Sequence, residues 1–258
     1  MRITTWNVNS LTARLQHVLD WLAANPVDVL CLQELKLTED KFPLLTLQEA
    51  GYPHCAVFGQ KTYNGVAILS RTPLRDVVRN MAQYPDESSR VIAATLDHPD
   101  GELRVINGYF VNGQAPGSEK FAYKMAWMDA LNQFVASEMQ QHPRLVLLGD
   151  FNITPEDRDS YDPESLRETI HHSTPEREQF RRLVALGLTD SFRLFEQPEK
   201  SFSWWDYRML GYQKNRGLRI DHILVSEALR AQVRACSIDR TPRKWKQPSD
   251  HAPVTIEV

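Results

Sequence analysis

Short stretches in which apolar residues alternate with polar ones, or follow one another without interruption, recur along the whole chain. Stretches of about four to eight such residues are typical of β-strands that lie half-buried or buried in a sheet. They predict strands over residues 3–8, 27–32, 65–70, 74–79, 90–96, 103–107, 144–148, 218–225, 233–238 and 252–258. Asp100 and Gly101 supply a hairpin signal between two of these strands.

Three other stretches have apolar residues at helical spacing. We predict a helix that begins near Leu11 and ends before Pro26, a second over residues 118–139, and a third over residues 175–186. Gly149 is expected to stop the strand at 144–148, and the polar residues 154–174 are expected to form a long loop. Short strands with helices between them favour sheets covered by helices in one domain, residues 1–258.

Composition narrows the class of protein. The 258 residues are 42% hydrophobic and 24% charged, which is typical of a globular protein and excludes disorder, collagen and coiled coil. Three cysteines without a Cys-x-x-Cys pair favour neither a zinc ribbon nor a disulfide framework, so we expect a reducing cytoplasm. The N-terminus lacks the apolar run of a signal peptide, and no stretch predicts a membrane span.

Carboxylates and amides recur where the predicted strands end. One carboxylate in such a place is usually a cap or turn residue, but a set of them beside buried strands needs partners or a cation. The set consists of Asn7, Asn9, Gln33, Glu34, Asp150, Asn152, Asp221, Asp250 and His251. Oxygen-rich groups of this kind favour Mg²⁺ or Mn²⁺, whereas zinc would require more His and Cys. The chain has no His-Glu-x-x-His motif and no glycine-rich nucleotide-binding loop.

Six motifs in a fixed order carry a resemblance to a known family. They are Trp6-Asn7-Val8-Asn9-Ser10-Leu11, Leu32-Gln33-Glu34, Asn107-Gly108-Tyr109-Phe110, Leu148-Gly149-Asp150-Phe151-Asn152, Arg219-Ile220-Asp221 and Ser249-Asp250-His251-Ala252-Pro253. In this order, from one end of the chain to the other, they resemble the exonuclease III family of DNA repair nucleases. The third and fifth motifs favour this branch over the pancreatic-type deoxyribonucleases and the lipid or inositol phosphatases of the same superfamily.

The resemblance implies an α+β fold, a four-layer α/β/β/α sandwich of two mostly antiparallel sheets flanked by helices. It also implies Mg²⁺-dependent cleavage of phosphodiesters in double-stranded DNA at 3′ ends, nicks or abasic sites, with Mn²⁺ as an alternative ion. The expected activities are 3′–5′ exonuclease and 3′-phosphatase or 3′-diesterase, with abasic-site endonuclease as a further one. We expect a monomer.

The same resemblance implies a role for each residue of the expected metal site. Glu34 would be the main metal ligand, with Asn7 and Asp250 close to the ion. Asp150 would orient or deprotonate the attacking water. These roles agree with the physics of the reaction, because a divalent ion offsets the negative charge that develops on the phosphate oxygens.

Four further residues would act on the phosphate. Asn152 would hold it and align the water, and Tyr109 would donate to it or assist the leaving oxygen. Asp221 would pair with His251, whose ring would hydrogen-bond the phosphate. A neighbouring carboxylate raises the pKa of an imidazole and selects its tautomer.

The expected DNA contacts lie mainly in one part of the chain. Residues 200–246 contain eleven Lys and Arg but four Asp and Glu, a net +7 in a chain of net charge −3. Phosphate contacts there would make binding sensitive to salt. Within this window, Trp204 resembles the family's pocket aromatic and Arg208 belongs to the same recognition segment, while Arg90 and Asn112 are expected to touch the backbone by analogy. The family commonly has Pro-Gln where this chain has Val111-Asn112.

His171 and His172 lie in the loop between the Asp150 motif and the helix at 175–186. We hypothesise that a ring there enters the sugar pocket and excludes an abasic nucleotide, which would favour trimming of 3′ ends over internal incision. The alternative is a pair of solvated loop histidines. Two alternatives to the whole interpretation are a phosphomonoesterase acting on lipid or inositol phosphates and a DNA-binding module without catalysis. The basic window disfavours the first, and the complete set of polar residues disfavours the second.

Overall fold

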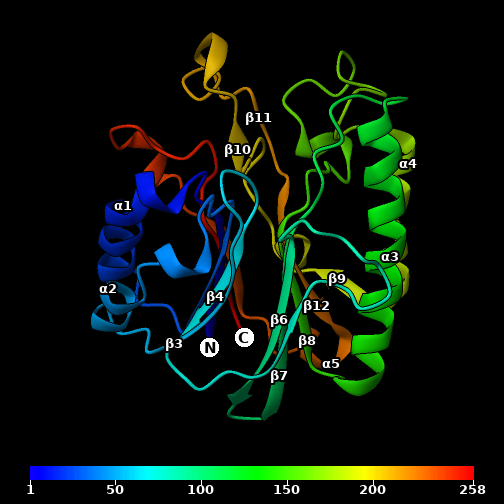
Figure 1. Ribbon diagram of the computed structural model, residues 1–258. Helices are drawn as coiled ribbons and strands as arrows, with labels where there is room; N and C mark the ends of the chain where they lie inside the picture. Colours follow the sequence, from blue (N-terminus) through cyan, green and yellow to red (C-terminus); the bar gives the residue numbers. More distant parts are fainter.

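The computed structural model describes all 258 residues, and its strands form two six-stranded sheets that pack face to face (Figure 1). The first sheet has the order β13 (Ala235–Ile238), β14 (Val254–Glu257), β1 (Arg2–Asn7), β2 (Val29–Gln33), β4 (Val66–Ser70), β3 (His54–Phe58). The second has the order β5 (Arg75–Arg79), β6 (Val91–His98), β7 (Gly101–Tyr109), β8 (Leu145–Asp150), β12 (Asp221–Ser226), β9 (Leu188–Asp190). A separate hairpin-like pair joins β10 (Trp204–Trp205) to β11 (Gly217–Leu218).

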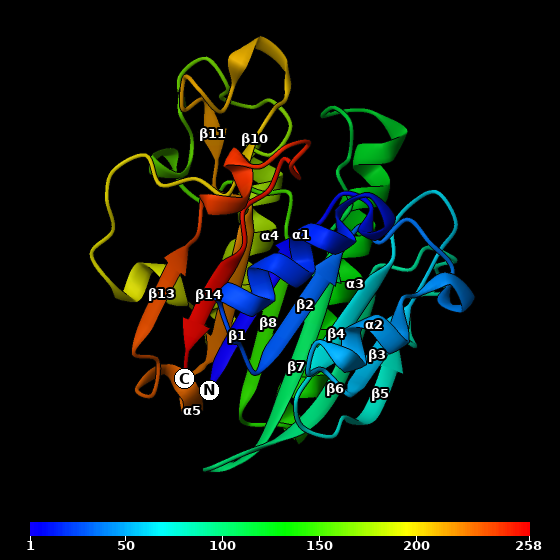
Figure 2. The same cartoon turned by 90° about the vertical axis from the view of Figure 1, so that its left-hand side faces the viewer.

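Helices cover the outer face of each sheet. The helices are α1 (Leu11–Ala24), α2 (Leu44–Glu49), α3 (Glu119–Gln141), α4 (Thr174–Ala185) and the short α5 (Glu227–Arg230). Helices α1 and α2 lie on the first sheet, facing the viewer in Figure 2, and α3 and α4 lie on the second. None of these helices combines the length and the apolar character that crossing a membrane requires.

Serine caps define where the three long helices begin. Ser10, Ser118 and Ser173 each accept a hydrogen bond from a backbone N–H in the first turn of the helix that follows. A serine oxygen at this position satisfies a donor that has no partner within the helix. The predicted helices are therefore present, with ends that differ from the predictions by one or two residues.

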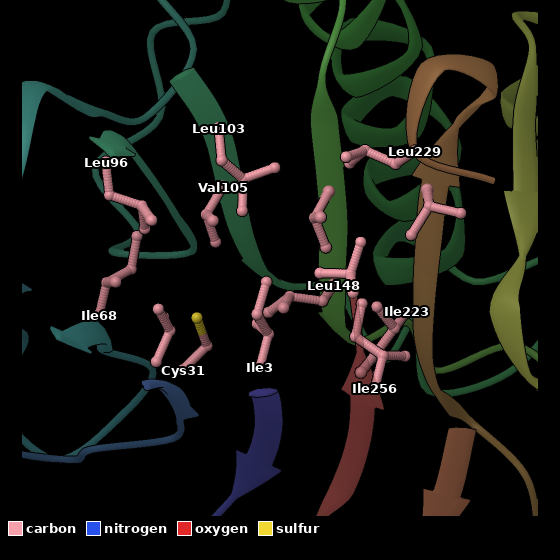
Figure 3. Packing of buried hydrophobic residues seen from close by; sticks show 14 of the residues in the cluster. Ile3, Cys31, Ile68, Leu96, Leu103, Val105, Leu148, Ile223, Leu229 and Ile256 are labelled. Atoms are coloured by element: carbon pink, nitrogen blue, oxygen red, sulfur yellow. The ribbon is translucent and has the colours of Figure 1, made fainter. Parts of the chain in front are cut away.

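Three apolar cores separate the four layers. One core lies between the two sheets and includes Ile3, Cys31, Val105, Leu148 and Ile256, whose side chains meet in Figure 3. The other two lie between each sheet and its helices, around Trp127 and Phe151 on one side and around Trp6 and Trp21 on the other. The expected four-layer sandwich is confirmed, and its sheets are mostly antiparallel, since only β1–β2 and β7–β8 run parallel.

Two predictions about elements were wrong, and several short elements were missed. The strand expected over residues 218–225 is two strands, because β11 pairs with Trp204 while β12 pairs with β8 and β9. Gly149 does not stop its strand, since β8 continues to Asp150. Helices α2 and α5 and strands β3, β9 and β10 were not predicted; each spans only two to six residues, too few for a clear apolar spacing.

Candidate active site

Register between strands brings the polar strand ends together. In the second sheet, Asp150 lies beside Tyr109 of parallel β7 and beside Asp221 of antiparallel β12. Asn7 ends β1 in the other sheet, and its side-chain amide donates to Asp150 Oδ2 across the gap at 2.9 Å. Residues that are 143 positions apart in sequence thus meet at one end of the sandwich, where the β10–β11 pair also lies (Figure 2).

The backbone at these strand ends is strained. Asn9, Glu34, Lys36 and Asn152 all have φ between 44° and 56°, a region that side chains other than glycine rarely adopt. Such conformations cost about 1–3 kcal/mol each and persist where the surrounding structure holds them. Gly149 is required for a related reason, because a Cβ there would lie 1.8 Å from the carbonyl oxygen of Gly108.

A candidate cation site lies where Glu34, Asp150 and His251 converge. One ligand atom from each of these residues lies within 4.8 Å of the others. Asn7 Nδ2 donates to Glu34 Oε1 at 2.9 Å as well as to Asp150, and Lys36 Nζ lies 2.9 Å from Glu34 Oε2. Carboxylate oxygens held at fixed positions are the donor set that Mg²⁺ prefers, so these residues fit the expected ion.

Asp250 lies beside this cluster but is not one of its converging ligands. Its Oδ1 accepts from Asn9 Nδ2 and its Oδ2 accepts from the indole of Trp204, both at 2.9 Å. Burial alone would raise the pKa of Asp250, but attraction to His251 and these hydrogen bonds outweigh burial and lower it. The Asp250 carboxylate is therefore kept ionised by its neighbours. One of them, Trp204, is the side chain that was expected to line the substrate pocket.

His251 and Asp221 form the expected pair. His251 Nδ1 lies 2.8 Å from Asp221 Oδ2, so this nitrogen donates, and Nε2 faces Asp150 Oδ2 at 3.6 Å. Burial disfavours the charged ring, but attraction to Asp221 and Asp150 outweighs burial and raises the pKa of His251. The ring is therefore cationic near neutral pH, and its second nitrogen points at the cluster.

The protonation of Asp150 and Tyr109 follows from their surroundings. Burial raises the pKa of Asp150, and the negative charges of Asp221 and Glu34 act in the same direction against the lowering effect of His251. Burial and the nearby Glu34 and Asp150 raise the pKa of Tyr109 well above its usual value, so its hydroxyl keeps its proton. Arg90 lies over the Tyr109 ring, 5.0 Å from its centroid, and donates to its carbonyl at 3.2 Å.

Asn152 is held from several directions. Its backbone N–H donates to Asp150 Oδ1 at 3.0 Å, and its amide donates to the carbonyl of Phe110 at 3.0 Å. Asn112, which is exposed, lies 3.4 Å from the Asn152 side-chain oxygen. Asn152 and Asn112 therefore lie together beside the cluster.

A cavity of about 330 Å³ opens beside Trp204. Its lining includes His171, His172, Leu218 and Arg208. His171 and His172 are both buried, and His171 Nδ1 donates to the Asn152 carbonyl at 2.6 Å, so the alternative of a solvated pair was wrong for both residues. A larger hollow of about 940 Å³ lies elsewhere, between residues 157–163 and 192–201, and contains none of the site residues.

The basic window is only partly assembled at this end of the molecule. Arg219 is buried between Asp159 and Asp190, and Arg230 belongs to α5, which lies at the far end from β10 and β11 (Figure 1). The exposed cations that belong to segments near the site are Arg208, Lys214, Arg216, Lys244 and Lys246. The +7 count therefore overstates the charge available to a ligand here.

Sequence reasoning missed two lysines that touch the site. Lys36 joins Glu34 to Asn9, whose Oδ1 it contacts at 2.6 Å. The strand ends at Gln33 and both Glu34 and Lys36 have positive φ, so no regular spacing in the sequence marks this contact. Lys124 reaches the Asn152 carbonyl at 2.8 Å from α3, and no local pattern marks it.

Comparison with known proteins agrees with this geometry. Residues 4–251 match the model of the Endonuclease/Exonuclease/phosphatase family. The chain is 35% identical to exodeoxyribonuclease III of Haemophilus influenzae, with 100% of this chain and 99% of that protein covered.

Similar solved structures agree with the family match. A structure of the 3′-5′ exonuclease NExo from Neisseria meningitidis is 53% identical with a TM-score of 0.95, covering 100% of this chain and 99% of that one. NExo from Neisseria has also been solved as a 3′ phosphatase bound to a product DNA hairpin, with a TM-score of 0.96, 53% identity, and coverage of 100% and 98%. An AP endonuclease from Archaeoglobus fulgidus is 32% identical with a TM-score of 0.93 and coverage of 99% and 98%.

Proposed function

The chain belongs to the endonuclease/exonuclease/phosphatase family, in its exonuclease III branch, and we propose that it is a Mg²⁺-dependent DNA repair phosphodiesterase. Its substrates are 3′ ends and nicks of double-stranded DNA, on which it acts as a 3′–5′ exonuclease and removes 3′-phosphates and 3′-diesters. The names of its Neisseria relatives, a 3′-5′ exonuclease and a 3′ phosphatase, support this choice.

One observation carries the proposal. Glu34, Asp150 and His251 converge within 4.8 Å, and Asp221 holds the histidine from behind. Mg²⁺ held chiefly by Glu34, with Asn7 and Asp250 close to it, or Mn²⁺ in its place, would supply Lewis-acid stabilisation of the phosphate oxygens. Asn7 donates a hydrogen bond to Glu34. Asp250 is held beside the cluster by hydrogen bonds from Asn9 and Trp204.

The remaining side chains act on the phosphodiester itself. Asp150 orients the attacking water and accepts its proton, since its carboxylate faces the cluster. The cationic His251 and the amide of Asn152 donate to non-bridging oxygens, where negative charge grows. Tyr109, which keeps its proton, donates to the phosphate or to the leaving oxygen.

The rim positions the duplex. Arg90 and Asn112 contact the DNA backbone, while Trp204 and Arg208 line the cavity that receives the terminal sugar. An aromatic ring stacks on sugar or base for about 1–3 kcal/mol. His171 lines this cavity together with Trp204, and we propose that its ring narrows the room for an abasic sugar, so abasic-site incision is expected to be the weaker activity.

The proposal also covers the domain organisation, the oligomeric state and the location of the protein. Residues 1–258 act as one catalytic domain, because the cluster draws side chains from both sheets. We infer a monomer that works in the cytoplasm; the three cysteines are unpaired.

A panel of end-labelled duplexes tests the proposal. The duplexes carry a 3′-phosphate, a nick, a recessed 3′ end or an abasic analogue, and each is incubated with Mg²⁺ or with EDTA. We expect Mg²⁺-dependent removal of the 3′-phosphate and stepwise shortening from 3′ ends. Phosphate release from inositol phosphates, without any cleavage of the duplexes, would instead establish the phosphomonoesterase alternative.

A further inference from the structure

A buried ion pair lies directly behind the proposed site. Lys124 of α3 and Glu176 of α4 are both fully buried, and the lysine ammonium donates to the glutamate carboxylate. Burying two charges is costly, and a pair of this kind seldom adds stability over apolar residues of similar size. The further hydrogen bonds of Lys124 and Glu176 therefore indicate a role for the ion pair other than stability.

Those contacts reach two segments of the site. Lys124 Nζ also donates to the carbonyls of Asn152 at 2.8 Å and Asn112 at 3.2 Å. Glu176 Oε1 accepts the backbone N–H of His171 at 3.1 Å, while its Oε2 accepts from the Ser173 N–H and hydroxyl. The lysine thus holds the segment that presents Asn152, and the glutamate holds the segment that presents His171.

The two segments are also joined to each other. The Asn152 carbonyl accepts from both Lys124 Nζ and His171 Nδ1, and it belongs to a residue with φ of 51°. His171 itself has φ of 69°. Two residues in strained conformations therefore depend on one buried ion pair for their shared hydrogen bonds.

We propose that Lys124 and Glu176 are positioning residues that hold Asn152 for phosphate binding and hold His171 in the cavity beside Trp204. This proposal rests on the proposed function, since both consequences concern DNA cleavage. Loss of the pair lets Asn152 move from the phosphate and lets His171 leave the cavity. The first lowers the rate of the chemical step, and the second widens access for an abasic sugar.

The experiment compares Lys124→Met, Glu176→Gln and the double variant with the wild type. On a 3′-phosphate duplex we expect kcat to fall roughly ten- to a hundredfold with KM nearly unchanged, because small misplacements of a positioned group have effects of this size. In Glu176→Gln the ratio of abasic-site incision to 3′-phosphate removal should rise several-fold.

A second ion pair on the same helix supplies the matched control. Glu138, also on α3, pairs with the buried Arg104 roughly 21 Å further along the helix and touches no site residue. Glu138→Gln should lower the thermal midpoint as the Lys124 and Glu176 variants do, while kcat and the activity ratio stay at wild-type values.

The double variant separates positioning from stability. With both charges removed, the thermal midpoint should recover relative to the single variants, while kcat stays low because the Asn152 carbonyl still lacks its lysine donor. Recovery of kcat together with the midpoint, or a wild-type kcat and activity ratio in Lys124→Met, would overturn the positioning role. Absence of DNA cleavage by the wild type would overturn the proposed function instead, so the two failures are distinguishable.

Discussion

His251 Nδ1 lies 2.8 Å from Asp221 Oδ2, and the opposite nitrogen of the ring faces Asp150. This geometry leaves one orientation for the imidazolium ring, with Nδ1 directed at Asp221 and Nε2 directed into the cluster. It also links three strand ends, because Asp221 belongs to β12, Asp150 to β8 and His251 to the segment before β14.

Replacing Asp221 tests this link. In Asp221→Asn the ring loses the largest of the charges that raise its pKa against burial, although Asp150 and Asp250 remain, so we expect the pKa of His251 to fall and the neutral ring to become populated at lower pH than in the wild type. We expect cleavage at pH 7.5 to fall by about 10²- to 10⁴-fold, with partial recovery as the pH falls and the ring regains its proton. The measurement is the pH dependence of 3′-phosphate release between pH 5 and 9. A variant profile parallel to that of the wild type would show that the charge of His251 is not used.

Asp150→Asn separates chemistry from binding. The amide keeps the size of the carboxylate but cannot accept a proton, so cleavage should fall by at least about 10²-fold. DNA affinity, measured by fluorescence anisotropy with a labelled nicked duplex, should remain close to that of the wild type. Loss of affinity in proportion to activity would mean that Asp150 supports the structure instead.

Glu34→Gln concerns the metal. Removing a ligand should raise the Mg²⁺ concentration at half-maximal activity by roughly tenfold or more, since even residues behind a ligand have effects of 10- to 100-fold. Mn²⁺ binding to the DNA-free protein, followed by electron paramagnetic resonance, should weaken in parallel. Glu39→Gln, on the exposed turn Glu39–Lys41, is the matched control. Identical metal titrations for the wild type and Glu34→Gln would exclude Glu34 as a ligand.

His171→Gly tests whether the His171 ring, which lines the cavity beside Trp204, excludes an abasic sugar. The backbone φ of 69° suits glycine, so the change removes the ring without adding backbone strain. Incision of an abasic duplex should rise roughly ten- to a hundredfold, while 3′-phosphate removal falls modestly with the loss of one donor to Asn152. His172→Ser shows which of the two rings matters, because His172 also lines the cavity but bonds Ser160 instead of the catalytic segment. Unchanged incision in His171→Gly would remove the idea that this ring excludes the abasic sugar.

His222 predicts how stability depends on pH. The ring is buried, donates from Nε2 to the Ile153 carbonyl at 2.9 Å and lies 3.0 Å from an Arg219 nitrogen. Burial and Arg219 lower the pKa of His222 to about 4, whereas an unfolded histidine has a pKa near 6.5. The unfolded state therefore takes up the proton first, and stability is lost as the pH falls from about 6.5 towards 4.

The size of this effect is measurable by urea unfolding. Between pH 7.5 and pH 5, His222 should account for about 2 kcal/mol of lost unfolding free energy. His222→Gln, which retains a donor for Ile153, should lose less over the same interval by about that amount. Equal losses in the two proteins would contradict a neutral buried His222.

Local patterns along the chain were enough for most elements and for the kind of chemistry. Alternation and helical spacing depend on neighbours a few residues apart, which is why α1, α3, α4 and most strands could be predicted. The family motifs named the polar strand ends, and the structure brings Glu34, Asp150, Asp221 and His251 together. Ser10, Ser118 and Ser173 precede the long helices in the sequence, as capping predicts.

Other features depend on which strands and helices become neighbours. The partners of Asp250 could not be predicted from its neighbours in sequence, because the fold places Asn9 and Trp204 on its two oxygens. Arg219 counted as a DNA-binding cation in the sequence, yet it is buried between two aspartates from other segments. Lys124 carries no local signal at all.

The order of residues along this polypeptide thus settled its elements, its family and its reactive groups, because those follow from short-range spacing and residue type. Which side chains hold each carboxylate, which cations stay exposed and which rings line the cavity depended on contacts such as that between Asn7 and Asp150, 143 residues apart. Such contacts are set by sheet register and layer packing, which no short stretch of sequence contains.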